Sequence, residues 1–174
     1  MILSLDISTS VVGYCILDEN NNIVLLDAFD LKNKKHYPDI FCKAQEIKHV
    51  LEDIKTSYNI THIYIEDALM LFAPGKSSAV TISTLLKFNG IVSYICYLVF
   101  DIKPNFISAS SARKTYGITI PRGSKAKKVV MEHIRKTEPQ LIIKLTPKGN
   151  PVPKYYDQID ALVIARAGYI KQTT

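Results

Sequence analysis

The fold of this chain is decided by residues 1–31, MILSLDISTSVVGYCILDENNNIVLLDAFDL. Three runs of aliphatic, β-branched and aromatic residues are separated here by short polar segments, and the triple Asn at 20–22 is typical of a hairpin turn. Runs of this length and composition predict strands that are largely buried. We therefore expect three hairpin-linked strands, over residues 1–7, 11–18 and 23–31.

Beyond residue 31, helical and strand patterns alternate. We expect a helix over 39–57, a strand over 61–66, a helix over 77–100, a strand over 104–108 and helices over 109–116, 124–137 and 156–171. Ser110 and Ser124 are the expected N-caps of two of these helices. This order predicts an α/β fold in which a five-stranded mixed sheet, with three antiparallel hairpin-linked strands plus two parallel strands, is flanked by helices.

Length and composition predict one domain over residues 1–174. No apolar run reaches the roughly 20 residues of a spanning helix, and no secretory leader pattern opens the chain. The three cysteines are odd in number and lie in apolar sequence, which is typical of reduced core residues. We therefore expect a cytoplasmic protein that has no membrane partner.

Four acidic residues stand at the ends of apolar segments. Asp6 ends the first strand and Glu66 ends the run HIYIE, while Asp157 and Asp160 open the stretch YYDQIDALVIARAGYI. The last two are three residues apart, so they share one face of a helix. Because a buried unpaired carboxylate is unfavourable, converging carboxylates normally hold a cation. Oxygen ligands without Cys or His favour Mg²⁺ or Mn²⁺, and two such ions can support phosphodiester hydrolysis.

Each of these acids also has a structural interpretation. A lone Asp after a strand is often a turn residue or a helix N-cap. Asp157 is a candidate cap of the last helix, and Asp67 is an alternative to Glu66 as the functional acid. The metal-site hypothesis therefore rests on the pattern of four acids rather than on any one of them.

Positive charge is concentrated before the last acidic pair. The chain has 22 Lys and Arg against 16 Asp and Glu, a net charge of +6, and 11 of the 22 cations lie between Arg113 and Lys154. A cluster of this kind predicts binding to a polyanion such as nucleic acid. The alternative is a solvated helix face, especially for SKAKKVVMEHIRK at residues 124–136.

Several of these segments resemble the RuvC-like Holliday junction resolvases, a family of the RNase H-like (retroviral integrase) superfamily. LDISTSVVGYCIL is similar to the family's first hairpin, in which a catalytic Asp ends strand one and a Gly-aromatic pair begins strand two. YIED, GKSSAVTISTLLKFNGIVSYIC and DQIDALVIA resemble the second acidic block, the long central helix and the D-x-x-D-A helix. Ser8 departs from the pattern, since the family usually has Gly there. The matched positions are Asp6, Gly13, Tyr14, Glu66, Phe88, Asn89, Gly90, Asp157, Asp160 and Ala161.

The resemblance implies a structure-selective endonuclease that cuts branched DNA, at four-way (Holliday) junctions or forks, in DNA recombination and repair. It implies two Mg²⁺ ions per site, with Mn²⁺ as an alternative. Carboxylates would bind the ions, and the ions would act by the two-metal mechanism. Lys127 lies where resolvases carry a lysine close to the scissile phosphate. The implied metal ligands are Asp6, Glu66, Asp157 and Asp160.

Further expectations concern the partners. In resolvases an apolar side chain near the active site wedges into the junction, and Leu69 and Phe72 are the candidates here. The alternative is that these side chains pack in the core. The long apolar helix over 77–100 suits a homodimer interface, which would match two active sites to a two-fold symmetric junction. The expected DNA-binding residues are Leu69, Phe72, Lys76, Arg113, Lys114, Arg122, Lys125, Lys127 and Lys128.

Other functions share parts of this pattern. LDISTS also resembles the phosphate-binding turn of actin-like sugar kinases and ATPases, but those enzymes usually have Gly in place of Ser8 and need two such domains. A DNA-binding module with a degenerate nuclease fold is a second alternative, but it gives the four acids no function. An RNase H acting on RNA–DNA hybrids is the alternative within the same fold. The sequence contains neither a P-loop nor a GxGxxG motif.

Overall fold

The computed structural model describes residues 1–68 and 78–173, which contain a five-stranded mixed sheet. Its strands are β1 (Ile2–Ile7), β2 (Val11–Leu17), β3 (Ile23–Asp30), β4 (His62–Glu66) and β5 (Asn105–Ile107). The sheet order is β3-β2-β1-β4-β5. β2 is antiparallel to β1 and β3, whereas β4 is parallel to β1 and β5. The predicted sheet is confirmed.

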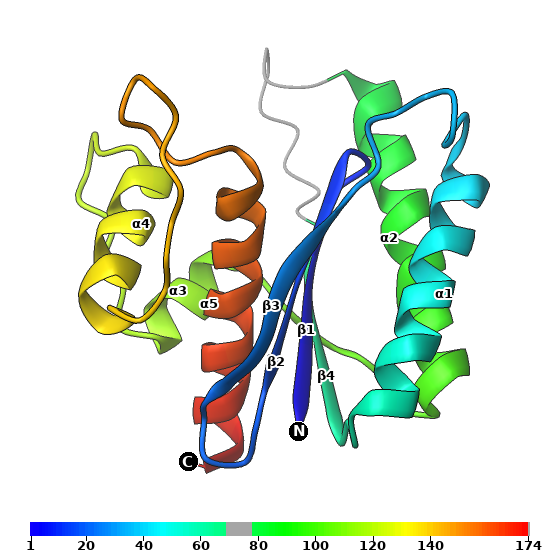
Figure 1. The fold of residues 1–174 in the computed structure, drawn as a ribbon, viewed down its shortest axis with the longest axis horizontal. Helices are drawn as coiled ribbons and strands as arrows, with labels where there is room; N and C mark the ends of the chain where they lie inside the picture. Colours follow the sequence, from blue (N-terminus) through cyan, green and yellow to red (C-terminus); the bar gives the residue numbers. More distant parts are fainter. Residues whose placement is uncertain (69–77, 174) are drawn as a thin grey trace.

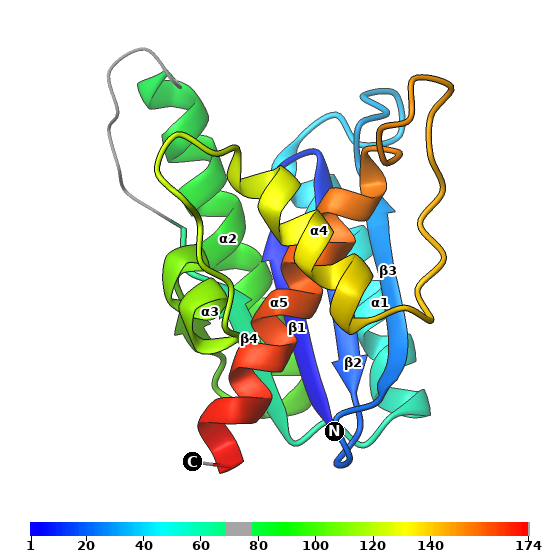
Figure 2. The same ribbon diagram turned by 90° about the vertical axis from the view of Figure 1, so that its left-hand side faces the viewer.

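Helices cover both faces of the sheet (Figure 1). One face carries α1 (Ile40–Ser57) and α2 (Ala79–Phe100), and the other carries α3 (Ala109–Thr115), α4 (Ala126–Thr137) and α5 (Lys154–Thr173). Figure 2 shows α5 crossing the sheet with α4 outside it. Both chain termini lie at the same end of the sheet, so the carboxyl ends of β1 and β4 and the beginning of α5 lie at the opposite end.

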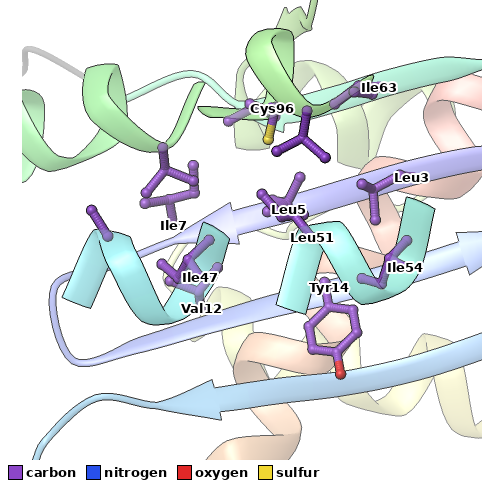
Figure 3. Close-up of a cluster of buried hydrophobic side chains, with 14 of the residues drawn as sticks. Leu3, Leu5, Ile7, Val12, Tyr14, Ile47, Leu51, Ile54, Ile63 and Cys96 are labelled. Atoms are coloured by element: carbon purple, nitrogen blue, oxygen red, sulfur yellow. The ribbon is translucent and has the colours of Figure 1, made fainter. Parts of the chain in front are cut away.

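The face toward α1 and α2 is an apolar layer. Successive residues of a strand point to opposite faces, so Leu3, Leu5 and Ile7 of β1 all enter this layer. Figure 3 shows these side chains opposite Ile47, Leu51 and Ile54, which are buried residues of α1.

On the other face, α5 approaches the sheet closely. A Cβ atom added at Gly13 of β2 would lie 2.1 Å from the carbonyl oxygen of Asp157, so only glycine fits there. The Ser4 hydroxyl on β1 donates a hydrogen bond of 2.7 Å to the carbonyl oxygen of Ala161. These two contacts fix the first half of α5 directly over β1 and β2.

A buried ion pair joins α5 to the end of α4. Nη2 of Arg166 lies 2.6 Å from Oε1 of Glu138, and Nε donates to the same oxygen at 2.8 Å. The guanidinium also donates to the carbonyl oxygen of Asn21, in the turn between β2 and β3. Because one side chain links three segments, α4 is held beside α5.

Two predicted helix caps are wrong. Ser108 caps α3 instead of Ser110, since its hydroxyl accepts a hydrogen bond from the Ser111 N–H at 3.2 Å immediately after β5 ends. Ser124 is engaged in the preceding turn, where its N–H donates to the carbonyl oxygen of Pro121 at 3.0 Å, and α4 begins after Lys125 without a side-chain cap. In both cases the preceding segment decides where the helix begins.

One sequence expectation about membranes also needs correction. α2 is long and apolar enough, by length and composition alone, to cross a membrane. About a third of α2 is buried, with Phe88, Val92 and Cys96 in the layer that also holds α1. A single helix of this kind is weak evidence for a membrane span.

Candidate active site

Three elements bring the four predicted acids to one end of the sheet. β1 and β4 are parallel neighbours, so Asp6 and Glu66, at or next to their carboxyl ends, lie at the same edge. Both follow residues that point into the α1 and α2 layer, so both side chains face the α5 side. The first two turns of α5 carry Asp157 and Asp160 at this end.

Gly13 explains how the helix reaches the strands. It pairs with Asp6 across β1 and β2, and its missing side chain leaves room for the backbone of Asp157. The beginning of α5 therefore rests on the strand beside Asp6. A larger residue at this position would push the helix and its acids away from the strand ends.

The turn after Asp6 tolerates serine at the position where the resolvase pattern has glycine. The Ser8 hydroxyl donates to the carbonyl oxygen of Val11 at 2.7 Å and accepts from the Val11 N–H at 3.0 Å. Ser8 has no positive φ, so the turn has no need of glycine. The serine hydroxyl therefore holds the turn that follows Asp6 closed.

The electrostatics show that the four acids are close neighbours. The pKa of Asp6 lies well above its ordinary value, first because the group is buried and then because Glu66, Asp160 and Asp157 are nearby. The positive charge of Lys127 acts in the opposite direction. Asp6 therefore lies within the negative field of acids from two other elements.

The other acids respond in the same way. Burial and the charge of Asp160 raise the pKa of Glu66 to about 7, whereas Arg113 and Lys127 lower it. Burial also raises the pKa values of Asp157 and Asp160, and the same two cations oppose the shift at Asp160. Burial is the largest cause at all four acids, and the nearby cations oppose the rise in pKa without cancelling it.

The structure decides between the alternatives for individual acids. Asp67 is exposed, and among the groups that shift the pKa of Glu66 it has the smallest effect. It is not among the causes of the pKa shifts of the other three acids. Asp157 lies in the first turn of α5, which begins at Lys154, so it is not the N-cap of that helix. Glu66 and Asp157 are therefore the residues that join the cluster.

The donor atoms suit a hard divalent ion. Carboxylate oxygens without Cys or His favour Mg²⁺ or Mn²⁺, and a cation would offset both the burial and the repulsion that raise these pKa values. Within residues 1–68 and 78–173, no three His, Cys, Asp or Glu side chains are already arranged to hold one ion.

Two predicted DNA-binding residues lie beside the acids. Arg113 comes from α3 and Lys127 from α4, and each lowers the pKa of both Glu66 and Asp160. Nζ of Lys127 also lies 5.3 Å from the centre of the Tyr156 ring. Tyr156 was not among the predicted site residues, although its position next to an acid of the D-x-x-D motif was a signal.

Four further predicted DNA-binding residues are exposed side chains on or near α3 and α4. Lys114 of α3 and Arg122 of the next loop are exposed, while Lys125 and Lys128 lie at the beginning of α4. Three further predictions lie outside the described residues, including both candidates for the wedge: Leu69, Phe72 and Lys76.

Asn89 is a second residue whose role was not foreseen. It is buried in α2, and its Nδ2 donates to the backbone carbonyl oxygen of Glu66 at 3.3 Å. The Ser93 hydroxyl in turn donates to the carbonyl oxygen of Asn89 at 2.7 Å. The middle of α2 therefore anchors the end of β4, which carries the second acid.

Comparison with known proteins identifies the architecture. No protein-family model and no curated protein sequence matches this chain. The structure of Thermus thermophilus RuvC superposes with a TM-score of 0.63, at 11% identity, over 99% of this chain and 95% of RuvC. This chain has the RuvC fold.

Two further structures agree with this assignment. T. thermophilus RuvC in complex with a Holliday junction substrate gives a TM-score of 0.64, at 11% identity, over 99% of this chain and 96% of that chain. The yeast mitochondrial Holliday junction resolvase Ydc2 gives 0.62, at 15% identity, over 99% and 78%. At such identities the likeness to RuvC concerns the fold, and the predicted RNase H-like class is confirmed.

Proposed function

We propose that this protein is a metal-dependent endonuclease that cuts branched DNA, with four-way junctions as its substrate. The proposal rests on one observation: β1, β4 and α5 bring four acids together at one end of the sheet, where burial and the neighbouring acids raise the pKa of Asp6, in a chain with the RuvC fold. The solved RuvC complex with a Holliday junction supports the choice of branched DNA.

In the proposed reaction, the carboxylates of Asp6, Glu66, Asp157 and Asp160 hold two Mg²⁺ or Mn²⁺ ions. Bound there, such ions would supply an activated water and stabilise the departing oxygen of the phosphodiester. No side-chain nucleophile is then required. The acids of β1 and β4 are carried by a packed sheet, so their backbone positions are set before substrate binds.

Lys127 and Arg113 have a different task. They act on the same carboxylates from α4 and α3, so a phosphate lying over the acids meets positive charge on that side. Their charge would orient the non-bridging oxygens of the scissile phosphate. Binding of DNA through such contacts should weaken with salt, because each neutralised phosphate releases counterions.

We also propose that the protein acts as a homodimer through α2. The exposed face of this helix carries Val80, Tyr94 and Leu98, whose exposed fractions are 76%, 60% and 56%. Gly90 lies on the exposed part of the same helix with nothing within 4 Å of an added Cβ, which leaves space for a second helix. A two-fold dimer would present one active site to each of the two junction strands that are cut.

The decisive experiment compares cleavage of a labelled four-way junction, a fork, a linear duplex and an RNA–DNA hybrid, with Mg²⁺, Mn²⁺ or EDTA. Paired metal-dependent nicks near the branch point are the expected result. Preferential cutting of the hybrid would favour an RNase H. Metal-independent binding without cutting would favour a DNA-binding module.

Matched variants test the site in the same assay. Glu66→Gln should abolish cutting and leave junction binding intact, because it removes a proposed metal ligand. Asp67→Asn removes the neighbouring exposed acid, which stands apart from the cluster, and should cut nearly as well as the wild type. Equal loss in both variants would contradict the assignment of Glu66.

A further inference from the structure

A pocket with a volume of about 620 Å³ lies beside the acids, between α4, the turn that precedes α5 and the first turn of α5. We call it the α4 pocket. The turn is closed by a hydrogen bond of 2.7 Å from the N–H of Thr146 to the carbonyl oxygen of Asn150. The volume is within the range of pockets that enclose small ligands. Its defining residues are Lys125, Lys127, Lys128, Arg135, Pro151 and Tyr156.

The pocket combines positive charge with an apolar and aromatic surface. Four of its residues are cations, and the single acid, Glu132, lies 3.8 Å from Lys128. Met131 is buried, and the partly buried ring of Tyr156 lies below Nζ of Lys127. A ligand that satisfies both properties carries negative charge and a flat ring, as a nucleotide does.

The position of the pocket relates it to the proposed site of cutting. Lys127 belongs to both places, since it lines the pocket and acts on the pKa of Asp6. Tyr156 immediately precedes Asp157. A nucleotide in the pocket would therefore lie only a few nucleotides along the DNA strand from the phosphate that sits over the acids.

Resting on the proposed nuclease function, we propose that the α4 pocket holds one unstacked nucleotide of the strand that is cut. Its base lies against Tyr156 and Met131. Its flanking phosphates lie on Lys125, Lys128 and Arg135. A concave site of this kind accepts a single base taken out of the stack rather than an intact duplex. Taking a base out of the stack costs least where that base is already unpaired.

The test is a cycle that combines a protein variant with removal of one base. Junctions that carry one abasic position are scanned through the cut strand, and affinity is measured in EDTA so that no strand is cut. Loss of base stacking predicts about tenfold weaker binding by the wild type at one position. Tyr156→Ala should bind the intact junction about tenfold more weakly, with no further loss at that abasic position.

Two matched variants keep the test independent of folding. Tyr156→Phe retains the ring and should behave as the wild type. Tyr156→Leu retains apolar bulk without an aromatic ring and should behave as Tyr156→Ala. Additive losses at every abasic position, or a wild type that is insensitive to base removal throughout the scan, would overturn the proposal.

A separate measurement tests the phosphate contacts. Arg135→Gln should lower the salt dependence of junction binding by about one counterion, because it removes one phosphate contact at the pocket. An unchanged salt dependence would contradict that part of the proposal. Failure of the nuclease assignment would appear as the absence of metal-dependent junction cutting by the wild type. A wild type that cuts junctions but shows only additive losses would refute the pocket proposal alone.

Discussion

The two faces of the sheet differ although the same strands build both. Along β1, Leu3, Leu5 and Ile7 enter a closed apolar layer under α1 and α2, whereas Ser4 and Asp6 face α5. One face is sealed by side chains, and the other is crossed by a helix close enough to form backbone contacts. The two-residue period of a strand therefore lets neighbouring residues serve stability and chemistry separately.

The largest effect should come from a change on the α5 face. Asp6→Asn removes the acid around which the other three gather. Changing a residue that only supports a metal ligand costs up to about 100-fold in activity, so loss of a ligand itself should lower the rate of cutting by more than that. Stability should be unchanged or higher, because a repelled charge is lost. Single-turnover cleavage and thermal denaturation measure the two quantities. Cutting at the wild-type rate would contradict the metal-site hypothesis.

The adjacent residue tests the opposite face. Leu5 is fully buried, so Leu5→Ala should lower the free energy of unfolding by about 2–5 kcal/mol through the cavity it leaves. Urea denaturation measures this loss. Cutting per folded molecule should remain close to that of the wild type. If Leu5→Ala lost activity without losing stability, the separation of roles between the faces would be wrong.

A pair of glycine substitutions sharpens the comparison. Gly13→Ala places a methyl group against the backbone of α5, so we expect a loss of about 1–3 kcal/mol and reduced cutting as the helix moves. Gly90→Ala has open space and should raise monomer stability by up to about 1 kcal/mol through helix propensity. Chemical denaturation of both variants provides the measurement. A loss at Gly90 that depends on protein concentration would indicate helices packed at that position.

The smallest effect concerns pH. The pKa of Glu66 is raised from 4.5 to about 7 in the folded protein, so the folded state binds more protons between these values. Stability of the metal-free protein should therefore fall as pH rises from about 4.5 to about 7, by roughly 1 kcal/mol after solvent screening. Mg²⁺ should restore stability at pH 8, because it would bind only the folded site. Glu66→Gln should flatten the profile, and a profile that rises with pH would contradict the crowding of acids.

Local patterns predicted most of the fold. The five strands lie within one residue of their expected bounds and the helices within two, because the periodicity of buried positions is a property of short segments. The misplaced caps at Ser110 and Ser124 depended instead on where β5 ended and on the turn before α4. Such boundaries are decided by the neighbouring element and are invisible in the helix pattern itself.

Local sequence was enough to predict the strand order of the first hairpins, the four acids at the ends of apolar segments and the surplus of cations before the last helix. Contacts between distant segments were needed to show that Glu66 rather than Asp67 joins the acids, that Gly13 admits α5 and that Asn89 anchors β4. They also joined Lys127 to Tyr156 beside the acids. The physical reason is that the periodicity of buried positions depends on neighbouring residues. Repulsion between acids, close approach of a helix to a strand and a shared pocket arise between segments that are far apart in the chain.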